Sequence, residues 1–375
     1  MKLLYITDAL AIWGGIERIL VEKANFLAER YGCDVHFITV NQGEHKMVFP
    51  LCDKIKYVDL NIRFHQQYKY SGIRRLFIWW KLKRLFAKRL RNYIDNTNPD
   101  VIITARASLI SEIVAVKGTV PVVYESHSLY IAQRYFSYGR FPKLKTELLC
   151  RDVRHADMIV SLTEGDAMDW KKYSSTVCVI PNIVHLYKGI SCSACTEKNV
   201  IFVGRFSPQK DIDSLLKIWK IVYNTHPQWH LWIVGGFGEC QDRLMKEIND
   251  IQANIDVYSP TSNIFEMYCK SSILLLTSVY ESFGLVLPEA MSCGLPVIAF
   301  DCPYGPRDII HDGVDGFLVG NRDVNLFAEK VRLLMDNYEL RVRMGKEGIR
   351  SSSRYKEEII MPRWLQLFEE LRSNL

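Results

Sequence analysis

The sequence predicts an α/β protein with two doubly wound domains, each built on a parallel sheet. Short β-branched or aliphatic runs alternate with longer helical patterns along almost the whole chain. This alternation is typical of parallel sheets that are covered by helices on both faces. The rhythm breaks once, at the polar, loop-like residues 180–198, and a strand pattern resumes at Asn199. A length of 375 residues also suits two domains better than one.

The predicted elements follow in chain order. The strand candidates are Leu3–Thr7, Val35–Val40, Lys56–Leu60, Val101–Thr104, Pro121–Tyr124, Met158–Ser161, Val177–Ile180, Asn199–Val203, His230–Val234, Ile255–Tyr258, Ile273–Leu276 and Val297–Ala299. Helical patterns fill the gaps, among them Gly15–Arg30, Arg74–Asn96, Lys143–His155 and Glu164–Lys172.

These elements predict a Rossmann-like N-terminal domain at residues 1–184 and a second Rossmann-like domain at residues 185–355, with a hinge near residues 182–197. The helical run at residues 356–375 follows the last strand, and we expect it to cross back to the first domain. Ligands of such sheets bind beyond the carboxyl ends of the strands, so two facing domains would enclose a cleft.

Composition and charge exclude several classes of protein. Hydrophobic residues make up 48% of the chain and charged residues 24%, which is typical of a globular protein and not of a disordered one. Cysteines within apolar runs, such as Cys150 and Cys293, fit reduced thiols in a cytoplasmic protein.

The first residues lack a cleavage-site pattern, and no window of about 18 residues is free of charges, so we predict neither a signal peptide nor a spanning helix. Residues 1–187 hold 27 Lys+Arg against 18 Asp+Glu, whereas the remainder holds 21 against 24, which indicates different electrostatic roles.

Two sites in the first half follow predicted strands. In TDALAIWGGIERIL, Gly14 and Gly15 lie where a strand turns into a helix, and their amides could approach a phosphate or a sugar. A simple turn is the alternative, and the absence of a GxGxxG pattern weakens the case for NAD. In VPVVYESHSLY, His127 follows a strand end and is predicted to face the cleft. A structural or surface histidine is the alternative there.

Two cations follow the first strand of the second half, in VIFVGRFSPQKDID. Gly204 allows the chain to turn, and Arg205 and Lys210 come after it. Such cations beyond a strand can bind a diphosphate, arginine through its planar fork and lysine as a point charge. A role in solubility is the alternative. A glycine cluster at residues 235–238 follows the next strand and suits close approach of a nucleotide, although turn glycines are common there.

Two acids bracket an apolar run in SVYESFGLVLPEAMSCGLPV. A helix is predicted to start near Leu285, and the amides of Phe283, Gly284 and Leu285 would then point into the cleft and favour phosphate. Glu281 could accept hydrogen bonds from sugar hydroxyls, and Glu289 could bind both hydroxyls of a ribose. The alternative is a capping acid and a helix-surface glutamate, but the apolar neighbours of Glu289 argue against a solvated position.

Two patterns offer a metal site as an alternative. Cys192-x-x-Cys195 is a lone pair of cysteines, which is weak evidence for zinc. Asp211-Ile212-Asp213 has the DxD pattern, but its place beside Lys210 at a helix start indicates helix capping. We therefore predict neither a metal nor another cofactor.

Taken together, these motifs resemble the family 4 glycosyltransferases, which have the GT-B-type fold. The resemblance is carried by Glu281-x7-Glu289, by GRFSPQK at residues 204–210, by EAMSCGLPVIAFD at 289–301 and by GPRDIIHDGVDGFLV at 305–319. It is thinner in the first half, where WGGIERIL, YESHS and IPNIV carry it. Members often have His-Asp where this chain has His127-Ser128, so a role for that acid is unsupported here.

The resemblance implies retaining transfer of a sugar from a nucleotide sugar without a metal. Arg205 and Lys210 would then neutralise the departing diphosphate, which gains negative charge as the glycosyl bond breaks. Glu281 would orient the donor sugar and Glu289 the ribose. By the same resemblance, Gly15 would lie against the donor phosphates and His127 near the sugar.

The segment RRLFIWWKLKRLFAKRLR, at residues 74–91, holds eight cationic residues, no acidic residue and four large aromatic ones. Basic residues interleaved with aromatic ones suit an interfacial helix on anionic lipid. Nucleic acid would also attract such a stretch, but no known nucleic-acid-binding fold accompanies it. The alternative is a domain helix whose long side chains cover the core.

The sequence thus predicts a retaining, metal-independent hexosyltransferase that uses a UDP-sugar. We expect it to extend a lipid-linked glycan for a bacterial surface polysaccharide such as lipopolysaccharide or capsule, at the cytoplasmic face of the plasma membrane. The alternatives are another nucleotide-sugar enzyme of the same fold, such as an epimerase, and a non-catalytic membrane or nucleic-acid binding protein.

Overall fold

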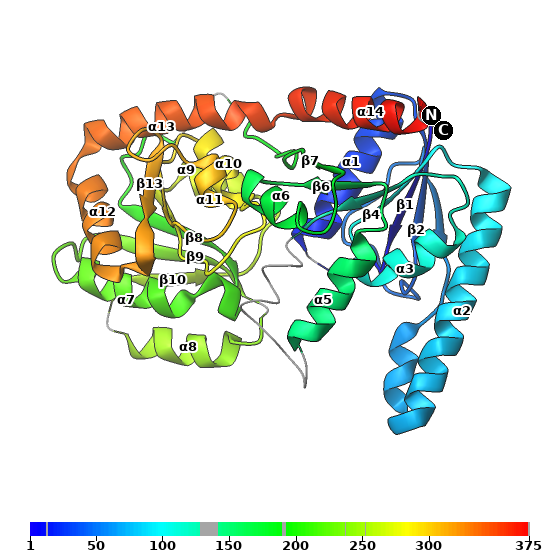
Figure 1. The fold of residues 1–375 in the computed structure, drawn as a ribbon. Helices are drawn as coiled ribbons and strands as arrows, with labels where there is room; N and C mark the ends of the chain where they lie inside the picture. Colours follow the sequence, from blue (N-terminus) through cyan, green and yellow to red (C-terminus); the bar gives the residue numbers. More distant parts are fainter. Residues whose placement is uncertain (13, 128–141, 190–192, 237, 252, 374–375) are drawn as a thin grey trace. The chain divides into compact units, whose positions relative to one another are not determined.

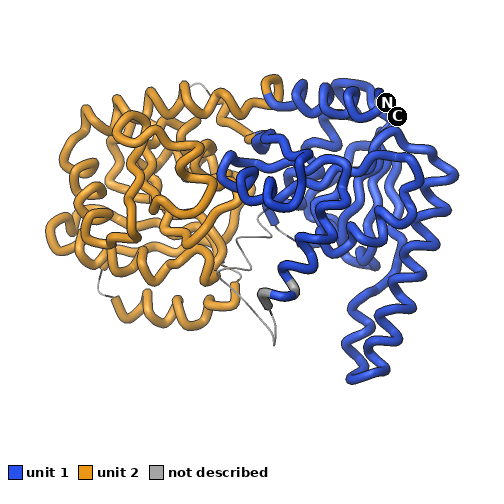
Figure 2. Tube along the Cα trace, in the orientation of Figure 1, with its two compact units in different colours: residues 1–183, 360–375 blue, residues 184–359 orange. Residues whose placement is uncertain are grey.

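The computed structural model describes residues 1–375 except 13, 128–141, 190–192, 237, 252 and 374–375 (Figure 1). The chain divides into two compact units (Figure 2). Unit 1 comprises Met1–Ile183 and Ile360–Leu375, and unit 2 comprises Val184–Ile359.

Unit 1 is built on a seven-stranded parallel sheet with the order β3-β2-β1-β4-β5-β6-β7. The strands are β1 (Lys2–Thr7), β2 (Asp34–Thr39), β3 (Lys56–Asp59), β4 (Val101–Thr104), β5 (Val122–Glu125), β6 (Met158–Ser161) and β7 (Val177–Val179). The helices are α1 (Gly15–Arg30), the short 3₁₀ helix η1 (Phe64–Lys69), α2 (Gly72–Thr97), α3 (Ala107–Val116), α5 (Pro142–Val153) and α6 (Glu164–Trp170). Most of α14 (Glu357–Ser373) also belongs to unit 1.

Helix α2 packs on the sheet of unit 1 through only part of its length. Its buried residues Leu82, Phe86, Leu90 and Ile94 recur every four positions and join the core that covers the sheet. Residues of one helix at this spacing lie on one face. Residues 72–77 at the start of α2 are exposed and project away from the sheet, and Ile78 is the first residue of the helix that packs against this core (Figure 1).

Unit 2 is built on a six-stranded parallel sheet with the order β10-β9-β8-β11-β12-β13. The strands are β8 (Asn199–Arg205), β9 (His230–Gly236), β10 (Ile255–Tyr258), β11 (Ile273–Leu276), β12 (Val297–Phe300) and β13 (Gly316–Val319). The helices are η2 (Pro208–Lys210), α7 (Ile212–Tyr223), α8 (Gln241–Asp250), α9 (Ile264–Cys269), α10 (Val286–Ser292), α11 (Pro306–Ile309), η3 (Gly320–Arg322), α12 (Val324–Asp336), α13 (Tyr338–Ser352) and η4 (Ser353–Tyr355).

The core of unit 2 forms where amphipathic helices bury large side chains against the strands. Trp219 of α7 is fully buried in this core, and the ring of Phe327 of α12 lies edge-on to Phe300 of β12 with 4.8 Å between their centroids. The sheet is therefore a rigid base for the turns that follow its strands.

The predicted fold class is confirmed, and each strand predicted from the sequence corresponds to a strand of the structure. Strand β13 was missed, because its four residues start with Gly316 inside a glycine-rich stretch. A Cβ at Gly316 would lie 2.4 Å from the carbonyl oxygen of Val297, so close pairing with β12 requires glycine here. Among the described residues, none of the helices combines the length and the apolar character that a membrane crossing needs.

Candidate functional site

The carboxyl ends of β8 and β9 approach each other closely in unit 2. Gly204 pairs with Gly235, and Arg205 pairs with Gly236. A Cβ at Gly235 would lie 1.9 Å from the carbonyl oxygen of Gly204, so no side chain fits at this position. Gly235, the second-last residue of β9, is thus required by strand packing, which accounts for it without a ligand.

Arg205 is the last residue of β8, and it is exposed. Among the described residues, the structure records no acidic partner for its guanidinium. An arginine at the carboxyl ends of parallel strands, whose guanidinium has no acidic partner, is well suited to bind an anion.

Lys210 lies in η2 and forms an ion pair with Glu281. Its Nζ lies 2.5 Å from Oε1 of Glu281, and the Ser278 hydroxyl donates to the same oxygen at 2.6 Å. The exposed fraction is 16% for the Lys210 side chain and 6% for that of Glu281. A Cβ at Gly204 would lie 3.3 Å from Cγ of Lys210, so this lysine lies directly over the end of β8. The structure thus brings together three predicted site residues: Gly204, Lys210 and Glu281.

Backbone hydrogen bonds fix the two loops that carry this pair. The N–H of Val279 donates to the carbonyl of Gln209 (2.8 Å), and the Thr277 hydroxyl donates to the carbonyl of Lys210 (2.9 Å). The loop after β11 is therefore tied to the turn after β8, and the ion pair is held by rigid supports on both sides.

Asp211 and Asp213 are engaged at the start of α7. Asp211 caps the helix by accepting from the N–H of Ser214, and it also pairs with Arg322. Asp213 accepts two hydrogen bonds from Arg243, at 2.6 and 2.8 Å. The capping interpretation of the DxD pattern is confirmed for Asp211, whereas Asp213 forms an ion pair with Arg243.

The residues between the two acids have different environments. Gly284 has a φ of +92°, which favours glycine, and Leu285 is the N-cap of the seven-residue helix α10. The ring of Phe283 is buried edge-on to Tyr355 with 5.2 Å between their centroids, so its side chain supports the loop.

Glu289 lies inside α10 and is buried. Only 4% of its surface is exposed, and the hydroxyl of Tyr268 donates to its Oε2 at 3.4 Å. The sequence interpretation that Glu289 does not lie on a solvated face is confirmed.

Sequence analysis missed two supports of this site. The N–H of Glu281 donates to the carbonyl of Pro303 (3.3 Å), and a Cβ at Gly305 would lie 2.3 Å from the carbonyl oxygen of Phe283. Arg322 donates to the carbonyls of Ser278 (2.9 Å) and Thr277. The GPR motif at residues 305–307 was a signal for the first support, whereas no sequence pattern links Arg322 to the loop after β11.

In unit 1, Gly14 and Gly15 lie at the start of α1, with Gly14 as the N-cap. A Cβ at Gly14 would lie 2.1 Å from Oε2 of Glu17, so the carboxylate of Glu17 folds over the start of the helix. Arg106 donates to Oε1 of Glu17 at 2.6 Å and lies 3.4 Å from Oδ2 of Asp8. Burial raises the pKa of Asp8 above its ordinary value, although Arg106 acts in the opposite direction.

His127 follows β5, and its side chain is 4% exposed. Its Nε2 lies 3.5 Å from Oε2 of Glu125, the last residue of β5, and that oxygen also accepts from the ammonium of Lys23 on α1. Burial opposes ionisation of Glu125, but Lys23 and His127 hold its pKa below the ordinary value. His127 thus lies beside the buried Lys23–Glu125 ion pair and is not an isolated histidine.

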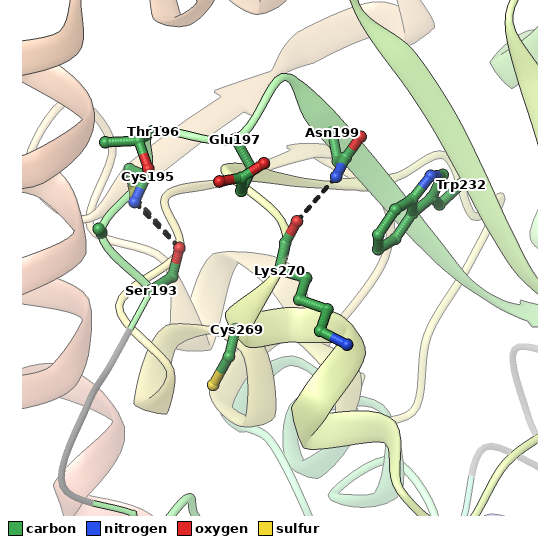
Figure 3. Close-up of a pocket in the computed structure, with 9 residues that line it drawn as sticks. Ser193, Cys195, Thr196, Glu197, Asn199, Trp232, Cys269 and Lys270 are labelled. Carbon is green, nitrogen blue, oxygen red and sulfur yellow. Dashed lines mark hydrogen bonds between the residues drawn. The ribbon is translucent and has the colours of Figure 1, made fainter.

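A pocket of about 500 Å³ lies at the opposite, amino end of the strands of unit 2, where β8 begins (Figure 3). Two of its polar groups are already paired: Asn199 donates to the carbonyl of Lys270 (2.9 Å), and the N–H of Cys195 donates to Ser193 Oγ (3.0 Å). The predicted site residues lie at the carboxyl ends of the strands, so this pocket is separate from them.

The zinc alternative at Cys192 and Cys195 has limited support. Cys192 lies outside the described residues, and Cys195 is buried with its thiol donating to the carbonyl of Gly294 at 3.4 Å. Burial raises the pKa of the Cys195 thiol, which disfavours the thiolate that binds zinc. Within the described part of the chain, no group of three or more His, Cys, Asp or Glu residues is arranged to hold a metal.

Two family models match the chain in succession. The model for Glycosyltransferase Family 4 matches residues 13–188, and the model for Glycosyl transferases group 1 matches residues 191–351.

Full-length relatives agree with these matches. The chain is 29% identical to the amylovoran biosynthesis glycosyltransferase AmsD of Erwinia amylovora over 97% of this chain and 98% of that protein. It is 24% identical to a GalNAc-alpha-(1->4)-GalNAc-alpha-(1->3)-diNAcBac-PP-undecaprenol alpha-1,4-N-acetyl-D-galactosaminyltransferase of Campylobacter jejuni over 100% of this chain and 99% of that protein.

A solved structure shares the fold. A mutant of TarM from S. aureus, in complex with fondaparinux, alpha-GlcNAc-glycerol and UDP, matches with a TM-score of 0.80 and 16% identity. The match covers 98% of this chain and 99% of that one. This likeness confirms the predicted GT-B-type fold.

Proposed function

Because this chain belongs to the glycosyltransferases that the family 4 and group 1 models describe, we propose that it transfers a hexose from a UDP-sugar to a lipid-linked glycan with retention of configuration and without a metal. The observation that carries the proposal lies at the carboxyl ends of the strands of unit 2, where Arg205 is the exposed last residue of β8 and Lys210, which lies over the neighbouring Gly204, pairs with Glu281.

This cluster suits a leaving diphosphate. Breaking a glycosyl–phosphate bond places negative charge on the diphosphate, and cations that are already in position stabilise that charge without reorganising. Arg205 would take the diphosphate through its fork, and Lys210 would share its charge between the diphosphate and Glu281. Glu281 would then present its other oxygen to the donor sugar.

The names of the relatives support the acceptor in this proposal. The Campylobacter jejuni relative is named for an acceptor linked through PP to undecaprenol, and the Erwinia amylovora relative is named for amylovoran biosynthesis. We propose by analogy that this chain extends a lipid-linked intermediate of a bacterial surface polysaccharide. A protein with such a substrate would work at the cytoplasmic face of the plasma membrane.

The first three turns of α2 support membrane association. Ile73, Leu76, Phe77 and Trp80 have exposed fractions of 85%, 65%, 61% and 45%. Their spacing of i, i+3, i+4 and i+7 puts them on one face of the helix. An exposed apolar face of this kind, bordered by cations, fits insertion among anionic lipid headgroups.

Cations continue this face along the helix. Lys81, Arg84 and Lys88 follow Phe77 at steps of four, three and four residues, and all three are exposed. The guanidinium of Arg84 lies 3.5 Å from the centre of the Trp80 ring, so charge and aromatic surface are presented together. Lys83 is different, because it pairs with Glu112 at 2.5 Å and faces the protein.

Nucleotide release from a panel of UDP- and GDP-sugars, with and without EDTA, tests the transfer. We expect one UDP-sugar to be consumed at the same rate in both conditions, and mass spectrometry should show its sugar on a lipid-linked acceptor. Failure to release nucleotide from any UDP-sugar contradicts the proposal. Loss with EDTA and recovery with manganese contradicts the metal-independent mechanism.

Flotation with vesicles of phosphatidylcholine, with or without phosphatidylglycerol, tests the membrane surface. The wild type should float with the anionic vesicles, and a variant with Arg75, Lys81, Arg84 and Lys88 changed to Glu should not. A second variant with Ile73, Leu76, Phe77 and Trp80 changed to Ser should bind more weakly and lose its remaining binding in high salt, because mainly electrostatic attraction is left.

The matched control reverses four exposed cations of unit 2, namely Lys217, Lys220, Lys246 and Arg343. It has the same change in net charge and should float like the wild type. Equal loss in both charge variants would show a general charge effect, and unaltered binding of the α2 variant would exclude α2 as the membrane surface.

A further inference from the structure

A lysine–glutamate pair is fully buried in unit 1. Lys23 lies in the middle of α1, Glu125 is the last residue of β5, and their side chains are 1% and 0% exposed. Burial lowers the pKa of the Lys23 ammonium, and the charge of Glu125 opposes that change.

An aromatic ring covers the same ammonium. Nζ of Lys23 lies 3.9 Å from the centre of the Trp364 ring, and Trp364 belongs to α14, which lies beside α1 within unit 1 (Figure 1). A cation over the face of a tryptophan is stabilised most when water is excluded. Lys23 is therefore held between a carboxylate and a ring, and the last helix of the chain takes part in holding it.

Stability alone is a weak explanation for this pair. Removing two charges from water is costly, and apolar residues of similar volume often give equal or greater stability in their place. A buried pair does fix the direction of its groups. In this case the oxygen that accepts from Lys23, Oε2 of Glu125, is also the one that lies 3.5 Å from Nε2 of His127.

We propose that Lys23 and Glu125 are positioning residues that set the orientation and tautomer of His127, with Trp364 holding Lys23 in place. The proposal rests on the proposed function, in which His127 contacts the donor sugar. The negative charge of the Glu125 carboxylate, 3.5 Å from Nε2, favours the tautomer with its proton on that nitrogen and Nδ1 as the hydrogen-bond acceptor. Without Lys23, Glu125 would lose the partner that fixes its Oε2.

The test is a double-mutant cycle on turnover in the full-length chain. Lys23→Met and Glu125→Gln are made together, so that neither charge is left buried alone and the fold is retained. We expect this pair variant to lower kcat roughly ten- to hundredfold, as loss of alignment does, with the KM for the donor nearly unchanged. In a His127→Ala background the same two changes should have no further effect, because they act through His127. Trp364→Leu should lower kcat by a smaller factor.

A matched control removes another ion pair of unit 1. Lys117 and Asp157 pair at 2.8 Å, and Asp157 accepts from the N–H of Val122 at the opposite, amino end of β5. Lys117→Met with Asp157→Asn should leave kcat unchanged. Wild-type kcat in the Lys23/Glu125 pair variant, or an undiminished loss in the His127→Ala background, overturns the inference.

Arg205→Ala separates this inference from the proposed function. If Arg205→Ala lowers kcat but His127→Ala and the pair variant do not, the inference fails and the proposed function stands. If wild-type chain shows no turnover, or Arg205→Ala retains all of it, the proposed function fails and the inference fails with it.

Discussion

Both sheets carry a lysine–glutamate pair near the carboxyl ends of their strands, but the two pairs differ in their access to solvent. The side chains of Lys23 and Glu125 in unit 1 are 1% and 0% exposed, whereas those of Lys210 and Glu281 in unit 2 are 16% and 6% exposed. The first lysine is covered by Trp364, and the second lies over Gly204, the residue before the exposed Arg205.

This difference indicates two uses of the same chemistry. A lysine that is enclosed by a carboxylate and a ring cannot exchange partners, so the unit 1 pair can only hold its neighbours in place. A lysine that water reaches can share its charge with an incoming anion. Exposure of the cation, more than the presence of the pair, therefore distinguishes a binding site from its support.

The largest expected effect is on stability, and it separates the two pairs. Lys23→Met leaves the carboxylate of Glu125 buried without its cation, so we expect it to lower the free energy of unfolding by about 3–5 kcal/mol. Lys210→Met should cost about 1 kcal/mol or less, because water reaches the site and Ser278 still donates to Glu281. Urea unfolding of the two variants, followed by circular dichroism, measures both losses. Equal losses would contradict the assignment of different roles.

A smaller effect is expected at the other acid of unit 2. Glu289→Gln keeps the size of the side chain but removes the charge that we propose binds the ribose, so UDP should bind about tenfold more weakly. Calorimetric titration with pyrophosphate is the control, since a ligand without a ribose should bind the variant and the wild type equally. If UDP affinity is unchanged, Glu289 does not contact the ribose.

The sequence was sufficient for the fold class and for almost every strand, because the apolar patterns that define strands and helices are local. Local patterns were also enough to predict the buried face of α2 (Leu82, Phe86, Leu90 and Ile94) and the capping role of Asp211. The edge strand β13 was not, since it is only four residues long, begins with a glycine and lies between two other glycines.

The sequence could not predict which residues pair with each other in the folded structure. Lys210 meets Glu281 across 71 positions, and Lys23 meets Glu125 across 102. Such pairs depend on strand order and on the lengths of intervening loops, neither of which has a residue pattern. For the same reason the sequence treated residues 74–91 as one membrane-facing segment, whereas the fold pairs Lys83 within it with Glu112.

The central claim is that Arg205 and Lys210 form a diphosphate site in unit 2, and calorimetric titration with UDP and UMP tests it most directly. The wild type should bind UDP at least about tenfold more tightly than UMP, because the second phosphate gains charge-assisted hydrogen bonds. In Arg205→Ala this preference should largely disappear while UMP binding is retained. An Arg205→Ala variant that keeps the full preference for UDP would contradict the account.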